Sequence, residues 1–307
     1  MFLISCLLLT SITGFVQSDV QNEVHEWGIV VFEENSPLMC GESWQDINLY
    51  PEYIRAEACA EAPVVWIYGE PFETGTFTVT TGEQSIFLTY PVPDRTALGL
   101  AEWDISAYAS TDIVVENIEE TPMILEGEET VDTFDGPFWW AMDSWREVQS
   151  LSLYQEYTGI TENFLYYECE LRSGFTDNFF EWGSNGNPVF TGTEIQEALY
   201  FTPGGIFSVS VPTAEFTPLT VPMLGGISTN TILDAFSAWG RSNLEPAEIS
   251  ALWETWEPVF TEEDSFWLVF PIPEQYYNSI STISLEMPES RLIVYNRLFL
   301  GAVKLNR

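Results

Sequence analysis

His25 and Glu26 are adjacent residues whose types could together move a proton, because an imidazole beside a carboxylate titrates near neutral pH. His25 is the single histidine among 307 residues, which removes most Ser-His-Asp and histidine–metal schemes. In a β-strand, however, adjacent side chains face opposite sides. We therefore expect His25 to be a structural, hydrogen-bonded residue at the start of the first sheet, within the motif His25-Glu26-Trp27-Gly28.

Carboxylates beside tryptophans suggest a second chemistry. Glycoside hydrolysis needs two acids across a cleft, about 5–10 Å apart, and sugars stack on exposed aromatic rings. With 47 Asp and Glu and 12 Trp, such neighbours also arise by chance, and a Trp in a β-sandwich is first a core residue. A carbohydrate-active or metal-assisted hydrolase and a sugar-binding β module both stay open. The clusters concerned are Trp103-Asp104, Trp139-Trp140, Glu181-Trp182 and Trp253-Glu254.

Acidic loops could hold a divalent cation, since Ca2+ prefers carboxylate oxygens. The best candidate loop contains Glu128, Asp132 and Asp135. It lacks the alternating acids and the distal Glu of an EF-hand, so we expect a solvated loop, with a calcium site as the alternative. A zinc site from three cysteines and His25 would lack any C-x2-C spacing. No other cofactor is predicted.

The overall charge limits the partners. Forty-seven Asp and Glu stand against 9 Lys and Arg, which gives a formal net charge of −38. Nucleic acids and anionic membrane surfaces need clustered basic residues, so both are excluded as partners. A surface of one sign repels itself, and salt screens that repulsion. We interpret the charge as an adaptation to salt or cations.

Residues 1–18 are predicted to be a secretory signal peptide. Met1–Phe15 is an uncharged apolar stretch, and Val16 and Ser18 occupy the positions before a cut at Asp19. A buried first helix or a short membrane anchor is the alternative, but a span needs about 20 apolar residues and this run is shorter. We expect a secreted or extracytoplasmic protein of the cell envelope.

Three cysteines remain after the predicted cut, and an odd number in an exported protein leaves one thiol over. Cys40 and Cys59 bracket a loop rich in Glu, Trp and Tyr, and we expect them to form a disulfide. On the chain-entropy model such a closure contributes about 3 kcal/mol. Cys169 lies in a strand-like run and is expected to be a buried thiol.

The elements that must position these residues mostly show the two-residue period of β-strands. Short β-branched or aromatic runs alternate with Gly, Pro, Asp and Thr, which favours a sandwich over βαβ units. The predicted strands are residues 28–32, 64–68, 76–80, 85–90, 112–116, 163–171, 188–191, 198–202, 206–211, 266–272 and 291–298.

Helix signals gather late in the chain. Residues 231–239 form a plausible helix that ends at Gly240. A second helix follows, with Ile249, Leu252, Trp253 and Trp256 on one face at helical spacing. Asn243 is its expected N-cap, with a proline in the first turn. A short helical turn is expected between the last two strands.

Six motifs, in order, resemble those of a group of uncharacterised exported bacterial proteins whose mature chain opens V-H-E-W-G-T-F-T. Their counterparts here are Val24–Gly28, Glu61–Tyr68, Phe164–Tyr167, Glu248–Trp256, Phe266–Pro273 and Arg291–Arg297. The chain departs from the pattern at Ile29, Ala62 and Asn296. The resemblance implies an exported, mostly β protein, and it transfers no catalytic residue.

Together these patterns predict a mainly β protein, with a β-sandwich-like body over residues 19–226. A smaller α+β portion, residues 227–307, packs onto the body through the helix bearing Trp253 and Trp256, or forms one continuous domain with it. The favoured function is non-enzymatic binding or a structural role in the cell envelope, with a glycan or envelope component as the partner. The alternative is a carbohydrate-active or metal-assisted hydrolase that uses paired carboxylates in an aromatic cleft.

Overall fold

The computed structural model describes residues 21–32, 38–39, 55–56, 58–109, 141–192, 194–211, 226–263 and 265–306. The predicted signal peptide, Cys40, the predicted strand 112–116 and the candidate calcium ligands Glu128, Asp132 and Asp135 lie outside these residues. The predictions that rest on them therefore stay predictions.

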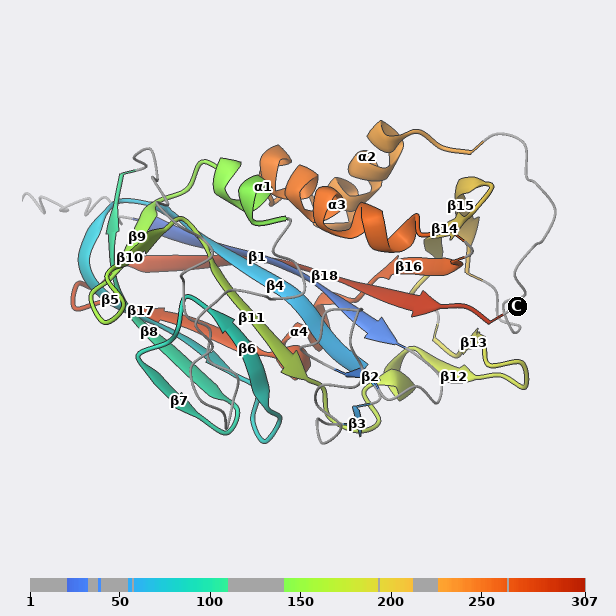
Figure 1. Ribbon diagram of the computed structural model, residues 1–307, viewed down its shortest axis with the longest axis horizontal. Coiled ribbons are helices and arrows are strands. Elements are labelled where there is room, and N and C mark those ends of the chain that lie inside the picture. The colour runs from blue at the N-terminus through green and yellow to red at the C-terminus, as the bar shows by residue number, and fades with distance from the viewer. Residues whose placement is uncertain are drawn as a thin grey trace, which may run out of the picture.

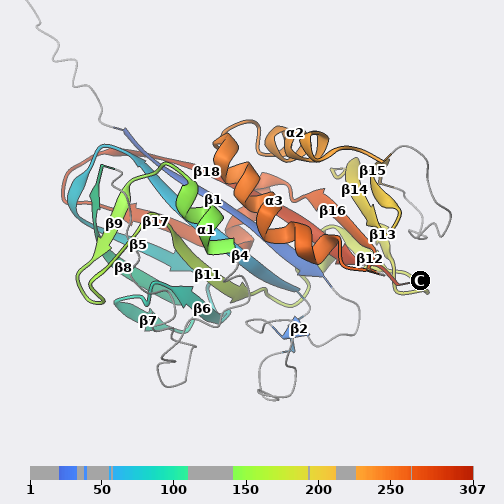
Figure 2. The ribbon, with the colours of Figure 1, turned by 45° about the horizontal axis from the view of Figure 1, so that its top comes forward.

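The fold has three layers: helices, an eight-stranded sheet and a six-stranded sheet (Figures 1 and 2). It is mainly β, as the sequence predicts. The large sheet has the order β15 (Gly205–Ser210), β14 (Glu197–Thr202), β16 (Trp267–Pro271), β18 (Leu292–Lys304), β1 (Gln21–Phe32), β4 (Ala58–Gly69), β11 (Leu165–Glu170) and β6 (Ile86–Tyr90).

The smaller sheet lies on the face of the large sheet that is opposite the helices (Figure 1). It has the order β10 (Ile160–Glu162), β9 (Ser152–Gln155), β8 (Leu100–Tyr108), β5 (Phe72–Thr80) and β17 (Thr282–Glu286), with β7 (Arg95–Ala97) also paired to β8. Two short hairpins complete the strands, β12 (Phe180–Trp182) with β13 (Pro188–Phe190) and β2 (Leu38–Met39) with β3 (Arg55–Ala56).

A separate hydrophobic core lies against each face of the large sheet. Between the two sheets, Val65 and Ile67 of β4 pack with Phe77 of β5 and Trp103 of β8. On the other face, Trp27, Trp66 and Trp145 pack under the helices. Because both faces of the central strands are covered, β1 and β4 are buried along most of their length instead of alternating.

In the described part of the chain, four helices and two 3-10 turns accompany the sheets. They are α1 (Met142–Glu147), η3 (Thr176–Asn178), α2 (Thr229–Trp239), α3 (Pro246–Phe260), η4 (Glu274–Tyr276) and α4 (Tyr277–Ile280). The structure confirms the two late helices, the end of α2 at Gly240 and the helical turn before the last strands. Helix α1 was not predicted; Trp145 anchors it by donating from Nε1 to Thr255 Oγ1 of α3 at 2.9 Å.

The predicted N-cap of α3, Asn243, is wrong. Pro246 occupies the first helical position, so the residue before it is the cap, and that residue is Glu245. The Glu245 side chain accepts from the Glu248 backbone, and Glu248 Oε2 accepts from the Glu245 N–H at 2.6 Å. This reciprocal pair is a capping box, formed here by two glutamates.

The C-terminal α+β portion is part of both sheets. Strand β18 pairs in parallel with β1, residue 292 facing 21 and residue 303 facing 32. It also pairs with β16, while β17 pairs with β5 of the smaller sheet. Residues 227–307 thus share their sheets with residues 19–226.

Candidate functional site

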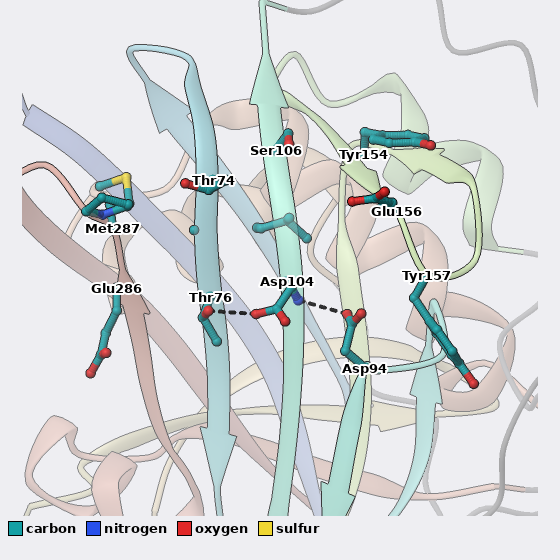
Figure 3. Close-up of a pocket in the computed structure, with 13 residues that line it drawn as sticks. Thr74, Thr76, Asp94, Asp104, Ser106, Tyr154, Glu156, Tyr157, Glu286 and Met287 are labelled. Carbon is teal, nitrogen blue, oxygen red and sulfur yellow. Dashed lines mark hydrogen bonds between the residues drawn. The ribbon is translucent and has the colours of Figure 1, made fainter.

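A groove of about 740 Å3 crosses the outer face of the six-stranded sheet (Figure 3). Its floor is formed by β5 and β8, one wall by the turn after β9, and the other by the end of β17. Its lining residues are Thr74, Gly75, Thr76, Asp94, Asp104, Ile105, Ser106, Tyr154, Glu156, Tyr157, Glu286, Met287 and Pro288. The groove therefore gathers segments from residue 74 to residue 288.

The alternation of strand side chains builds the floor. In β8, Trp103 and Ile105 point into the core between the sheets, so Asp104 and Ser106 point outward. In β5, Phe77 and Val79 are buried, while Thr74 and Thr76 face the groove. The alternation that points apolar side chains into the core therefore places the hydroxyls of Thr74, Thr76 and Ser106 and the Asp104 carboxylate on the outer face of the sheet.

A hydrogen-bond network fixes the central carboxylates. Asp104 accepts from Arg95 Nη1 at 2.8 Å and from Thr76 Oγ1 at 2.7 Å. These bonds, with Arg95 the larger contributor, lower the pKa of Asp104, so it stays an ionised acceptor. Asp94 Oδ2 accepts from the Asp104 backbone N–H and from Gln155 Nε2, both at 2.8 Å. The two carboxylates are held rigidly at the centre of the groove.

Two further carboxylates stand on opposite walls. Glu156 lies in the tight turn between β9 and β10, and Glu286 ends β17. Both side chains are exposed, and within the described part of the chain neither has a hydrogen bond or an ion pair. Their charges are therefore available to a ligand.

Tyrosines supply the aromatic surface of the groove. Tyr157, beside Glu156, is 67% exposed, and Tyr154 is half-buried two residues before Glu156. In Figure 3 their rings lie on the same wall, above and below Glu156. Among the described residues that line the groove there is no Lys, Arg or His. The site is thus an array of hydrogen-bond acceptors and negative charge beside exposed rings.

The predicted motif His25-Glu26-Trp27-Gly28 lies elsewhere, in β1 of the large sheet. His25 faces α3 and bonds Glu248, whereas Glu26 faces the other sheet and bonds Arg297. The two side chains do not share a site, as the strand geometry predicts. Trp27 is fully buried. A side chain at Gly28 would meet the Phe299 ring at 2.8 Å, so this position requires glycine.

Of the three cysteines that follow the predicted signal peptide, the structure describes Cys59 and Cys169. Cys169 is a free, buried thiol, as expected, and burial raises its pKa well above the ordinary value. Cys59 is fully buried in β4, but Cys40 lies outside the described residues, so their pairing stays a prediction. Within the described ranges, no group of three or more His, Cys, Asp or Glu is arranged to hold a metal ion. In the same residues no helix has the length and apolarity of a membrane span.

The acid–tryptophan pairs contribute one residue to the groove. Trp103 and Trp253 are buried in the cores, and Trp139-Trp140 lies outside the described residues. Only Asp104 of these pairs lines the groove. The aromatic residues of the groove are tyrosines, which the sequence analysis missed. A Tyr on each side of Gln-Glu, just before a turn glycine, is the local signal that could have drawn attention to them.

Comparison of the chain with protein-family models, with curated proteins and with solved structures found no match.

Proposed function

We propose that this protein is an exported, non-enzymatic binding protein, and that the groove of Figure 3 holds an amine-bearing oligosaccharide. The observation that carries the proposal is the described lining: its ionisable and hydroxyl-bearing side chains are carboxylates and hydroxyls, and none of these lining residues is basic. Such a surface accepts hydrogen bonds and attracts cations.

The sugar component is supported by the rings and the hydroxyls. Exposed tyrosines provide apolar faces with a polar tip, on which sugar rings stack. Thr74, Thr76 and Ser106 can both donate to and accept from sugar hydroxyls. A simple polyamine would use the charge of the groove but not these features.

The amine component is supported by Glu156 and Glu286. They are exposed, unpaired in the described part of the chain, and located on opposite walls. An oligosaccharide that crosses the strands could place an ammonium group near each, and charge-assisted bonds are roughly twice as strong as neutral ones. The lowered pKa of Asp104 suits an ionised acceptor of hydrogen bonds from a ligand.

Titration calorimetry with three probes tests the proposal. A glucosamine hexamer at mildly acidic pH should bind more tightly than the N-acetylated hexamer, which is neutral, and than spermine, which has no rings. Added NaCl should weaken binding of the charged hexamer. Equal affinity for both hexamers would refute the amine component, tighter binding of spermine would refute the sugar component, and no binding to any probe would refute the proposal.

Matched variants localise the site. Tyr157→Ala and Glu156→Gln should each weaken binding of the glucosamine hexamer by about 1–3 kcal/mol. The controls are Tyr108→Ala, which removes an exposed tyrosine outside the groove lining, and Glu254→Gln on α3. If the controls weaken binding as much as the groove variants do, the ligand binds somewhere else.

A further inference from the structure

His25 connects three elements of the fold through side-chain hydrogen bonds. From β1, its Nδ1 lies 3.0 Å from Glu248 Oε2 of α3, and its Nε2 lies 3.2 Å from Glu23 Oε2 and 3.0 Å from Asn296 Nδ2 of β18. The ring also packs on Tyr68 of β4, with 4.5 Å between centroids.

The protonation state of His25 decides which of these hydrogen bonds form. A neutral imidazole has one N–H and can donate to one carboxylate only, whereas an imidazolium donates from both nitrogens. Glu248 faces Nδ1 and Glu23 faces Nε2, so an imidazolium can donate to both carboxylates. The neutral ring instead donates from Nδ1 to Glu248 and accepts at Nε2 from the Asn296 amide, whose nitrogen can only donate.

Glu248 depends on this cation. It is fully buried and accepts from the Tyr68 hydroxyl at 2.8 Å and from the Glu245 backbone N–H, besides His25. A buried carboxylate that loses its cationic partner is strongly destabilising. Glu248 also forms the capping box of α3, so the loss of its cationic partner destabilises the first turn of this helix.

We propose that the cluster of His25, Glu23, Glu248, Tyr68 and Asn296, here named the His25 clasp, is a pH-dependent device that holds the start of α3 on the sheet and loosens when the imidazolium is deprotonated. Within the described residues, the ionisable groups next to His25 are Glu23 on β1, Tyr68 on β4 and Glu248 on α3. Glu245, the N-cap of α3, acts on Tyr68, and β18 contributes Asn296.

The direction of the pH effect follows from the charges. Burial alone lowers the pKa of His25, but bonds and charges first from Glu248 and then from Glu23 raise it above the ordinary 6.5. A group whose folded-state pKa is raised stabilises the fold fully below its unfolded pKa. The contribution is lost as the pH rises through the folded-state pKa, so the clasp holds in acid and loosens in mild alkali.

The lone histidine makes the test direct. Its imidazole NMR resonance should titrate above pH 6.5 in the full chain, and Glu23→Gln, which keeps the shape but removes one charge, should lower that pKa. Titration at or below 6.5, or no change in Glu23→Gln, would overturn the proposal.

Hydrogen exchange measures the loosening itself. Between about pH 6 and pH 9, the protection factors of the Glu248 and Ile249 amides should fall about tenfold for each pKa unit of the shift. The fall should be absent in His25→Gln and should move to lower pH in Glu23→Gln. Because Glu168 also titrates near neutral pH, all variants are compared in a Glu168→Gln background. The same pH dependence in His25→Gln as in its parent would refute the clasp. Should His25→Gln fail to fold, the shift in Glu23→Gln still decides.

Discussion

Arg297 and Glu26 are register partners on the parallel strands β18 and β1, and their side chains form an ion pair between the two sheets. Glu26 is fully buried and also accepts from the Tyr167 hydroxyl at 2.6 Å. Arg297 also donates a hydrogen bond from Nη2 to Ser281 Oγ at 2.8 Å. The pair ties the first described strand to the last.

Glu26→Gln should destabilise the protein by about 3–5 kcal/mol, because it leaves the buried Arg297 charge without its anion. Urea unfolding monitored by circular dichroism measures the change. The matched control is Glu274→Gln, which breaks the exposed pair with Arg241 and should cost less than about 1 kcal/mol. Equal losses of unfolding free energy in the two variants would show that the buried Glu26–Arg297 pair stabilises the fold no more than the exposed pair does.

Stability should fall as the pH rises from about 5 to 8, and Glu168 should cause part of the fall. Burial raises the pKa of Glu168 from its ordinary 4.5 to about 7. The folded state thus holds a proton that the unfolded state has released, and the advantage is lost as the pH passes through the folded-state pKa. A shift of about 2.5 units corresponds to about 3 kcal/mol. Urea midpoints at both pH values should differ less in Glu168→Gln than in the wild type; equal differences would contradict the assignment.

Gly301→Ala should destabilise the fold by about 1–3 kcal/mol through overpacking. A Cβ at this position of β18 would lie 2.5 Å from Cε2 of Phe270, which packs among other aromatic rings. Gly204→Ala is the control, since its Cβ would meet nothing closer than Thr202 Oγ1 at 3.5 Å. Thermal melts compare the two, and a tolerated Gly301→Ala would mean that Phe270 can move aside.

Added NaCl should raise the melting temperature. The net charge of −38 makes the surface repel itself, and the screening length falls from about 10 Å at 0.1 M to about 3 Å at 1 M salt. Melts across this range, with parallel samples in low millimolar Ca2+ at matched ionic strength, separate screening from specific cation binding. A flat salt response would end the interpretation of salt adaptation, and a jump with Ca2+ alone would favour a carboxylate site.

Non-reducing peptide mapping should recover a cross-link between Cys40 and Cys59 and an unmodified Cys169. The Cys169 thiol is free and buried, so it should react with alkylating reagents only after denaturation. A cross-link of Cys169 to either of the other two would show that the predicted pairing is wrong.

Local pattern predicted the fold class, the strands of the large sheet and the two late helices, but of the smaller sheet it predicted only β5. The run at 64–68 lies in β4, those at 206–211 and 291–298 overlap β15 and β18, and the helix with Ile249, Leu252 and Trp256 on one face is α3. The opposite orientations of His25 and Glu26 also follow from the period of a strand. Helix α1 escaped prediction because it is six residues long and is fixed by contacts with α3.

The groove could not be predicted in the same way. Thr76, Asp104, Glu156 and Glu286 are far apart in sequence and meet because β5 lies between β8 and β17. Strand order is set by long-range packing, which no local pattern reports. The partner of His25 is likewise 223 residues away, at Glu248.

The position of β18 has a consequence for how the chain folds. β18 lies between β1, the earliest of the described strands, and β16, so the large sheet has no continuous centre until residues 292–304 are present. A chain that emerges N-terminus first would carry exposed strand edges until residues 292–304 join them. Such non-local topologies fold slowly and are prone to aggregation while incomplete. During synthesis these strand edges would therefore stay open until β18 inserts between β1 and β16.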